Sequence, residues 1–158
     1  MGLEIRRVVT GHDAEGRATV KIDEVTQHGI TTRPGCDTCV IWSTDTLPAD
    51  NNDETDGGKR EVATAHEGGS VFRVIRYMPG VTPRNHRTDS IDYAVVLSGE
   101  IVMQLDETEV TLRAGDVLVQ RGTIHNWVNR GTEPCVIAFT LIAAPPVQVG
   151  GRVLEATG

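Results

Sequence analysis

The chain of 158 residues has few aromatic side chains, little lysine and no long apolar run. A membrane-spanning helix needs about 20 consecutive apolar residues, so a membrane partner is not expected. The first residues also lack the apolar segment and the cleavage site of a secretory signal, and we therefore expect a cytoplasmic protein. The formal net charge of -7 argues against a nucleic-acid partner, because phosphate backbones attract clustered Lys and Arg.

Cysteine is scarce, and its arrangement indicates neither a zinc site nor a redox motif. Cys36 and Cys39 form a CxxC pair, but a zinc site would need a second pair of ligands, and Cys135 does not provide it at a recognisable spacing. A redox CxxC opens a helix, whereas a strand-like segment follows Cys39. A cytosolic location also argues against disulfides. We interpret the three cysteines as incidental residues near strand edges.

Helical periodicity is absent as well, since no window repeats apolar residues at helical spacing for three turns. The content of Gly, Thr and Val favours strands instead. An N-terminal hairpin is predicted from residues 5–11 and 17–25, followed by a strand at 39–45. Closely spaced strands are then expected at 70–78, 92–99, 100–105, 109–115, 116–122, 125–129 and 134–142. This pattern predicts an all-β sandwich or closed barrel.

The chain is predicted to form a single domain, residues 1–158. N-terminal strands occupy about 4–44, and the core barrel occupies about 70–143. The polar stretch of about 45–69 has few apolar anchors, so we expect a loop that is mobile or ordered mainly by contacts at its ends.

Two segments of the predicted core carry motif-like spacings. In the first, Gly80 is followed after five residues by His86-Arg-Thr88, after three more by Asp92, and after six more by Gly99. This segment resembles the first cupin motif, with Thr88 in place of the usual second His and Asp92 in place of Glu.

The second segment contains Gly115, Gly122, His125 and Asn129, and it resembles the second cupin motif. The usual Pro is absent, and the first interval is one residue short. The chain is thus similar to the small single-domain members of the RmlC-like cupin superfamily, of the cupin 2 conserved barrel type. That resemblance implies a cupin-type jelly-roll antiparallel β-barrel, a homodimer, and a small-molecule substrate or ligand.

The candidate metal ligands are His86, Asp92 and His125. Residues two apart in a strand share a face, so His86 and Thr88 point the same way. If that face is interior, His125 belongs to a second alternating set, with Trp127 and Asn129, that can meet it. Two imidazoles and one carboxylate suit iron, zinc or manganese. We expect a divalent metal ion, which is iron, zinc, manganese or nickel, and its identity stays open. The alternative is a barrel that has no metal, in which both histidines serve as hydrogen-bonding residues.

Asn129 and Arg121 are the candidate catalytic residues. Asn129 shares the alternating set of His125 and is expected to line the same cavity, and Arg121 can clamp a substrate carboxylate if its guanidinium points inward. The alternative for Arg121 is a surface position at a turn. Three other histidines, His12, His28 and His66, lie in polar segments and are expected to be exposed.

The predicted function is that of a small-molecule enzyme in which a divalent metal acts as a Lewis acid. Elimination, isomerisation or related chemistry on an oxygenated metabolite would follow. Two alternatives remain, an iron-dependent dioxygenase and a metal-free binding protein, because the fold alone does not determine the reaction.

Overall fold

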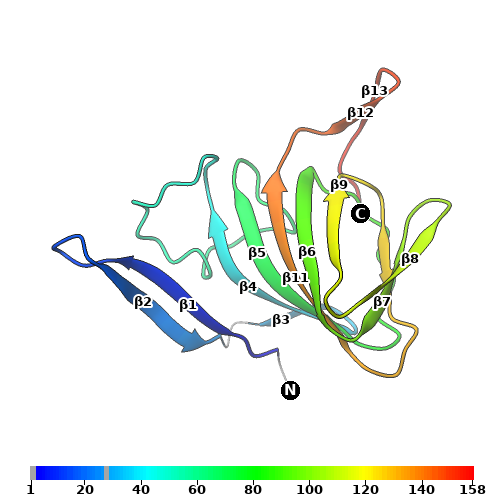
Figure 1. The fold of residues 1–158 in the computed structure, drawn as a ribbon. Coiled ribbons are helices and arrows are strands. Elements are labelled where there is room, and N and C mark those ends of the chain that lie inside the picture. Colours follow the sequence, from blue (N-terminus) through cyan, green and yellow to red (C-terminus); the bar gives the residue numbers. More distant parts are fainter. Residues whose placement is uncertain (1–2, 27–28) are drawn as a thin grey trace.

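The computed structural model describes residues 3–26 and 29–158. The described residues contain no helix, and therefore none long enough to cross a membrane. Two antiparallel sheets make up the body of the molecule (Figure 1). The larger sheet has the strand order β3 (Ile30–Arg33), β4 (Cys36–Thr44), β5 (Ser70–Tyr77), β11 (Cys135–Ala143), β6 (Ser90–Ser98) and β9 (Val117–Arg121). The smaller sheet has the order β10 (Asn126–Val128), β7 (Glu100–Gln104) and β8 (Glu109–Arg113). The all-β prediction is confirmed.

The main core lies between the two sheets and follows from strand alternation. On β6, Ala94 and Val96 are buried, whereas Tyr93 between Asp92 and Ala94 is half exposed. The remaining buried apolar residues of this core are Cys36, Tyr77, Val81, Ile101, Met103, Leu112, Trp127, Cys135, Ile137, Phe139 and Leu141. A fully buried side chain of this kind contributes about 1.5 to 3 kcal/mol. The sheets are therefore held together by apolar side chains from nearly every strand of the barrel.

Gly99 joins the two sheets at the turn between β6 and β7. Its φ is 77°, a left-handed conformation that side chains other than glycine adopt with strain. A Cβ atom there would also collide with the carbonyl oxygen of Pro134. The glycine that ends the first motif is thus required by backbone geometry.

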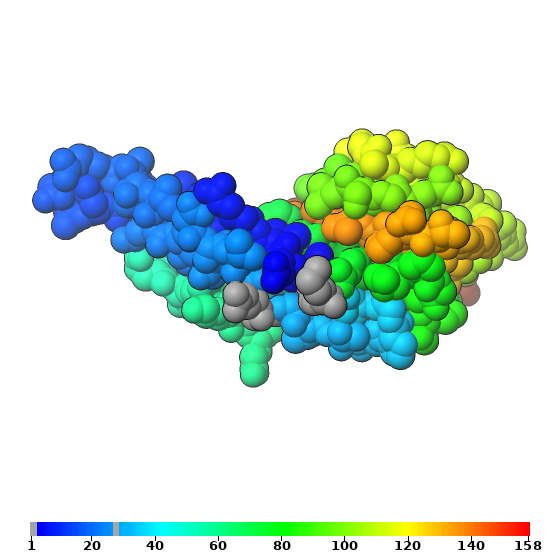
Figure 2. Space-filling model, turned by 90° about the horizontal axis from the view of Figure 1, so that it is seen from below, coloured from blue at the N-terminus to red at the C-terminus, as the bar shows by residue number. Residues whose placement is uncertain are grey.

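The N-terminal segment covers part of the outer face of the larger sheet. Leu3 packs there with Cys39, Ile41 and Val74 in a second, smaller apolar cluster. The hairpin that follows, β1 (Arg6–His12) and β2 (Ala18–Val25), was predicted from the sequence and is confirmed. It extends away from the barrel (Figures 1 and 2).

The three cysteines are free and buried. Cys36 belongs to the core between the sheets, and Cys39 belongs to the outer cluster. The two lie three residues apart on β4, so alternation places their thiols on opposite faces. Burial raises the pKa of Cys135 to about 11, which keeps this thiol protonated and inert. The CxxC pair is therefore not a joint binding site.

The long loop at 45–69 has contacts along its whole length. Arg60 forms ion pairs with Asp45 and Asp53, and Asp56 forms one with Arg7 of β1. The Nη2 group of Arg73 donates hydrogen bonds to two backbone carbonyls near the end of the loop. Contacts thus hold the middle of the loop as well as its ends, because charged residues of the loop form ion pairs with β1 and with each other. Its mobility in solution stays a prediction.

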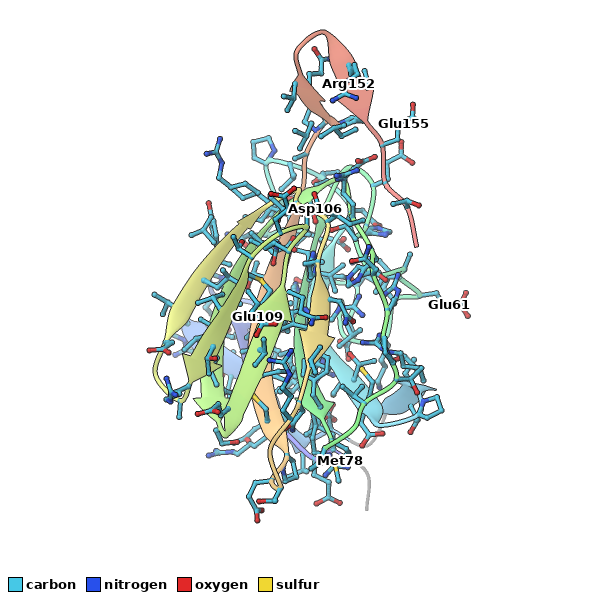
Figure 3. The ribbon with its side chains drawn as sticks, turned by 90° about the vertical axis from the view of Figure 1, so that its right-hand side faces the viewer. Glu61, Met78, Asp106, Glu109, Arg152 and Glu155 are labelled. Carbon is cyan, nitrogen blue, oxygen red and sulfur yellow. The ribbon has the colours of Figure 1, made fainter. Side chains whose placement is uncertain are left out.

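The C-terminal residues form a short hairpin, β12 (Val147–Val149) and β13 (Arg152–Leu154), that projects from the barrel. Figure 3 shows the Arg152 and Glu155 side chains on this projecting segment. Thr157 then returns to the barrel and forms an isolated antiparallel bridge with Arg87, the residue after His86. The last residues therefore lie beside the segment that carries His86.

Candidate functional site

His86 and His125 lie side by side in the barrel, as the sequence predicts. Their backbones exchange two hydrogen bonds: the His86 N–H donates to the His125 oxygen at 3.0 Å, and the His125 N–H donates to the His86 oxygen at 2.9 Å. This bridge joins the segment before β6 to the residue before β10. The centroids of the two imidazoles are 4.2 Å apart. Main-chain pairing thus holds the two side chains together.

The orientation of both imidazoles is determined by backbone carbonyls. The Nδ1 atom of His86 lies 3.0 Å from the oxygen of Arg84, and the Nδ1 atom of His125 lies 2.8 Å from the oxygen of Thr123. A carbonyl oxygen only accepts hydrogen bonds, so each Nδ1 carries the proton and each Nε2 keeps its lone pair. Metal-ligating histidines have this same arrangement, with the second ring nitrogen bonded to a carbonyl or carboxylate.

Both imidazoles are neutral at neutral pH. Burial lowers the pKa of His86 to about 4, helped by the neighbouring His125 ring and the charges of Arg84 and Arg33. Burial is also the main cause that lowers the pKa of His125. Neutral imidazole is the form that binds metal ions.

Asp92 is buried on the interior side of β6, and its carboxylate accepts a hydrogen bond from a neighbouring hydroxyl group. Ser90 donates a hydrogen bond of 2.6 Å to Oδ1 of Asp92, and the Thr88 and Ser90 hydroxyls are 2.8 Å apart. Burial raises the pKa of Asp92 to about 6, against the opposing effects of the Ser90 bond and the Arg73 charge. Within residues 3–26 and 29–158, no group of three or more His, Cys, Asp or Glu side chains is arranged to hold a metal ion. The structure brings the two histidines together and does not place Asp92 with them as a third ligand.

Asn129 is buried, but its amide is used by the backbone. Its Nδ2 group donates to the Tyr77 oxygen at 3.0 Å and to the Glu133 oxygen at 2.9 Å, and its Oδ1 accepts from the Gly131 N–H at 2.9 Å. The expected catalytic role is therefore corrected to a structural one. Alternation predicted that Asn129 points inward, but its amide is hydrogen-bonded to the backbone of the loop after β10.

Arg121, the other expected catalytic residue, is exposed at the end of β9. Val117 and Val119 are exposed on the same face, whereas Gln120 is buried. Alternation thus directs Arg121 outward and Gln120 inward, and the expected carboxylate clamp is corrected to a surface arginine. Among the other histidines, His12 is exposed as predicted, whereas His66 is half-buried and donates a hydrogen bond to the Asp45 carboxylate; His28 lies outside the described residues.

A cavity of about 370 Å³ opens beside His86. It is lined by Thr32, Arg33, Cys36, Thr38, Thr64, Arg73, Ile75, Tyr77, Arg84 and His86. Sequence reasoning missed Arg73 as a site residue. A signal was available, because alternation along β5 places Arg73 on one face with Val71, Ile75 and Tyr77, where a charged residue is unexpected.

The two facing sheets and the paired histidines in their interior define a double-sheet barrel of the cupin type. The sequence profile of the family described as "Cupin domain" matches residues 73–142. The chain is 36% identical over 157 residues to the cupin-domain-containing oxidoreductase fogC of Aspergillus ruber, covering 94% of this chain and 77% of that protein. It is 33% identical to the cupin-domain-containing oxidoreductase virC of Hypocrea virens, covering 90% of this chain and 78% of that protein. The chain belongs to the cupin-domain family.

A solved structure agrees with this assignment at the level of the fold. The cupin domain of Cnp3 from Schizosaccharomyces pombe superposes with a TM-score of 0.53 and 10% sequence identity, covering 87% of each chain. The predicted jelly-roll barrel is thus confirmed.

Proposed function

We propose that the chain is an oxidoreductase that acts on a small organic molecule inside the barrel. The observation that carries the proposal is the pair of buried, neutral imidazoles of His86 and His125, held beside a cavity by backbone hydrogen bonds. The names of the relatives, cupin-domain-containing oxidoreductases, favour redox chemistry over the elimination or isomerisation expected from the sequence. Of the sequence alternatives, the iron-dependent one is therefore preferred.

The residues present fit two ligands of a divalent metal ion. Each histidine has its Nδ1 hydrogen committed to a carbonyl, and each Nε2 lone pair is available for a metal. His86 and His125 would hold the ion, which when bound supplies Lewis-acid or redox chemistry to an oxygenated substrate. Asp92 is left outside this ligand pair, because no three His, Cys, Asp or Glu side chains of the described residues are arranged to hold a metal ion.

Asp92 instead has the properties of a group that holds or moves a proton. Its pKa of about 6 lies close to neutrality, where a carboxyl group works efficiently as a general acid or base. Ser90 donates a hydrogen bond to Oδ1 of Asp92, so we assign the exchange of the proton to the other oxygen, Oδ2. The buried Trp127, whose ring centroid lies 5.8 Å from that of His125, helps to exclude water from the histidine pair.

A metal-free small-molecule-binding protein is the second candidate. It is favoured by Thr88, a hydroxyl residue where the first motif usually has its second histidine, and by the hydrogen bond between this hydroxyl and that of Ser90. The two candidates differ in whether the wild-type protein takes up a metal stoichiometrically.

Metal binding to the histidine pair is tested with purified protein supplied with Fe(II), Mn(II), Ni(II) or Zn(II). We expect one ion per chain by elemental analysis after desalting, and at least roughly tenfold weaker binding in His86→Ala and His125→Ala. His66→Ala is the matched control, because His66 lies outside the barrel and should keep wild-type affinity. A wild-type protein that takes up none of the four ions would leave only the metal-free candidate.

The reaction class is tested separately with the metal-loaded protein. A panel of oxygenated metabolites is incubated in air, and the products are analysed by mass spectrometry. Products that have gained oxygen or lost hydrogen support an oxidoreductase. Products that have lost water, or have rearranged at constant mass, would return the function to elimination or isomerisation.

A further inference from the structure

The cavity beside His86 has an unusual charge for so acidic a protein. Arg33, Arg73 and Arg84 all line it, together with the neutral His86. Within the described ranges, no aspartate or glutamate is among its lining residues. Since the whole chain carries a formal charge of -7, the cavity is a local concentration of positive charge that favours an anion.

Arg73 is the most deeply buried of the three arginines, with 7% of its surface exposed. Its Nη2 group donates to the carbonyl oxygens of Ala63 at 2.6 Å and Thr64 at 3.0 Å, and its buried Nε has no partner among the described residues. Asp92 attracts Arg73 electrostatically, but the two form no ion pair in the described part of the chain. A buried cation without an ion-pair partner is costly, and a bound anion would remove that cost.

A second buried polar atom in the same cavity also lacks a partner. Thr38 is 2% exposed, and its hydroxyl makes no hydrogen bond to any described residue. Thr38 and Arg73 come from neighbouring strands, β4 and β5, and both line the cavity. Buried polar groups are almost always hydrogen-bonded in folded proteins. Two unsatisfied polar groups among the lining residues of one cavity therefore indicate a ligand with acceptor atoms. A carboxylate is such a ligand, because it accepts charge-assisted hydrogen bonds from a guanidinium.

A larger cavity lies next to this one and is more open to the surface. Thr64 and Arg84 line both the inner cavity and an outer one of about 910 Å³. Small apolar residues make up much of the outer wall: Ala63, Ala65, Ala143, Ala144, Pro145 and Pro146. The inner cavity alone has room for a small carboxylic acid, and the two together have room for a larger one with an apolar part.

We propose that the substrate is an organic carboxylic acid with an apolar body, whose carboxylate is bound by Arg73 and Arg84 beside His86. The apolar body extends past Thr64 into the outer cavity. This inference rests on the proposed function, because it names the substrate class of the same site. Arg73 and Arg84 thus have the carboxylate-binding role that the sequence suggested for Arg121.

Binding is tested by isothermal titration calorimetry with 3-phenylpropanoate as the probe. Its neutral amide and acetate serve as matched ligands that lack the charge and the apolar body, respectively. We expect the amide and acetate each to bind at least about tenfold more weakly than 3-phenylpropanoate, since charged hydrogen bonds and apolar burial are each worth about 1.4 kcal/mol or more. An amide that binds as tightly as the acid would overturn the proposal.

The residues are tested with Arg84→Gln and Arg121→Gln. Arg84 is half-buried and lines both cavities, and its guanidinium donates to the Gly158 oxygen at 2.7 Å and to the Thr64 hydroxyl at 3.3 Å. A bound carboxylate would share these donors, so Arg84→Gln should weaken binding of the probe at least about fivefold without preventing folding. Arg121 is exposed outside the barrel and should show wild-type affinity. Arg73→Lys keeps the buried charge but loses the unpartnered Nε donor, and it should also weaken binding. Equal effects of Arg84→Gln and Arg121→Gln would contradict the assignment.

His125→Ala separates this proposal from the metal-dependent function. His125 does not line the inner cavity, so the variant should still bind 3-phenylpropanoate when metal binding is lost. A wild-type protein that binds metal but not the probe would reject the carboxylate proposal alone. A protein that binds the probe but no metal would reject only the metal-dependent reaction.

Discussion

At the scale of single residues, the interior of this barrel holds polar groups whose burial has a cost. Asp92 is 5% exposed and accepts a hydrogen bond from Ser90, but it has no ion-pair partner among the described residues. An isolated buried carboxylate is destabilising when ionised, because its charge leaves water without a full replacement. A buried carboxyl group with a raised pKa is the kind of group that active sites use, in line with the role proposed above for Asp92.

This cost predicts a pH-dependent effect of Asp92→Asn. The pKa of Asp92 is raised by burial from 3.8 to about 6, so the folded protein holds this proton more tightly than the unfolded chain does. Ionisation therefore lowers the stability of the wild type as the pH rises from about 4 through 6. We expect Asp92→Asn to be more stable than wild type by about 2 kcal/mol at neutral pH, and by little or nothing near pH 4.

Urea unfolding of metal-free protein at both pH values measures this difference. Asp106→Asn, at an exposed turn, is the control and should change stability little at either pH. A loss of stability in Asp92→Asn at neutral pH would show that the carboxylate has a stabilising partner that outweighs its burial.

At the scale of elements, an ion-pair network attaches the N-terminal hairpin and the long loop to the larger sheet. The guanidinium of Arg7 on β1 is almost fully buried and contacts Glu24 of β2 at 2.8 Å, Asp56 of the loop at 2.6 Å and the Ile41 oxygen of β4 at 3.2 Å. Bidentate pairing of this kind is stronger than an ordinary surface ion pair. Three separate elements thus meet at one arginine.

Asp56→Asn is expected to weaken this junction. The hydrogen bond from Arg7 is the main cause that lowers the pKa of Asp56 to about 2. A lowered carboxyl pKa stabilises the folded state fully above about pH 4, and that contribution is lost as the pH falls from 4 to 2. Because a quarter of the Asp56 side chain is exposed, we expect a discounted loss of about 1 kcal/mol at neutral pH.

Unfolding curves between pH 2 and pH 7 check this, together with limited proteolysis of residues 45–69. The difference between Asp56→Asn and wild type should shrink below about pH 4, and cleavage of the loop should become faster in the variant at neutral pH. Glu54→Gln, two residues away and exposed, is the matched control. Unchanged proteolysis in Asp56→Asn would indicate that other contacts hold the loop.

At the scale of the whole molecule, apolar surface remains uncovered on the outside of the larger sheet. Tyr93 and Leu97 of β6 and Val117 and Val119 of β9 are all at least half exposed. Tyr93 and Val119 are paired across the two strands, so this surface is continuous along the sheet edge. It lies on the same face as the cluster that Leu3 covers, because Val74 is in register with Ala138 and Ala138 with Val95.

The homodimer implied by the family resemblance stays a prediction, and this surface gives it a test. We expect the wild type to be a dimer by size-exclusion chromatography with light scattering, and Val117→Glu/Val119→Glu to be a monomer, because a buried charge would oppose association. Val153→Glu, at a half-exposed position on the projecting C-terminal hairpin, is a control that should remain dimeric. A wild type that is monomeric across a dilution series would reject the prediction.

The sequence alone determined the fold class, most strand positions and the histidine pair. The predicted strands at 70–78 and 100–105 match Ser70–Tyr77 and Glu100–Gln104, because alternation and turn residues are local signals. The spacing around His86 and His125 also specified their faces. The short strands β3, β12 and β13 were missed, since a few residues carry too little periodic pattern.

Only the tertiary structure decided which partner each polar side chain finds. Asn129 and Asp92 were placed on the interior side by alternation, but the first is taken up by backbone carbonyls and the second by Ser90. Arg73 and Thr38 became site residues because β4 and β5 pair and direct them into one cavity. The side of a strand to which a side chain points follows from its position in the local chain. Its hydrogen-bond partners and its burial depend on residues far away in the sequence.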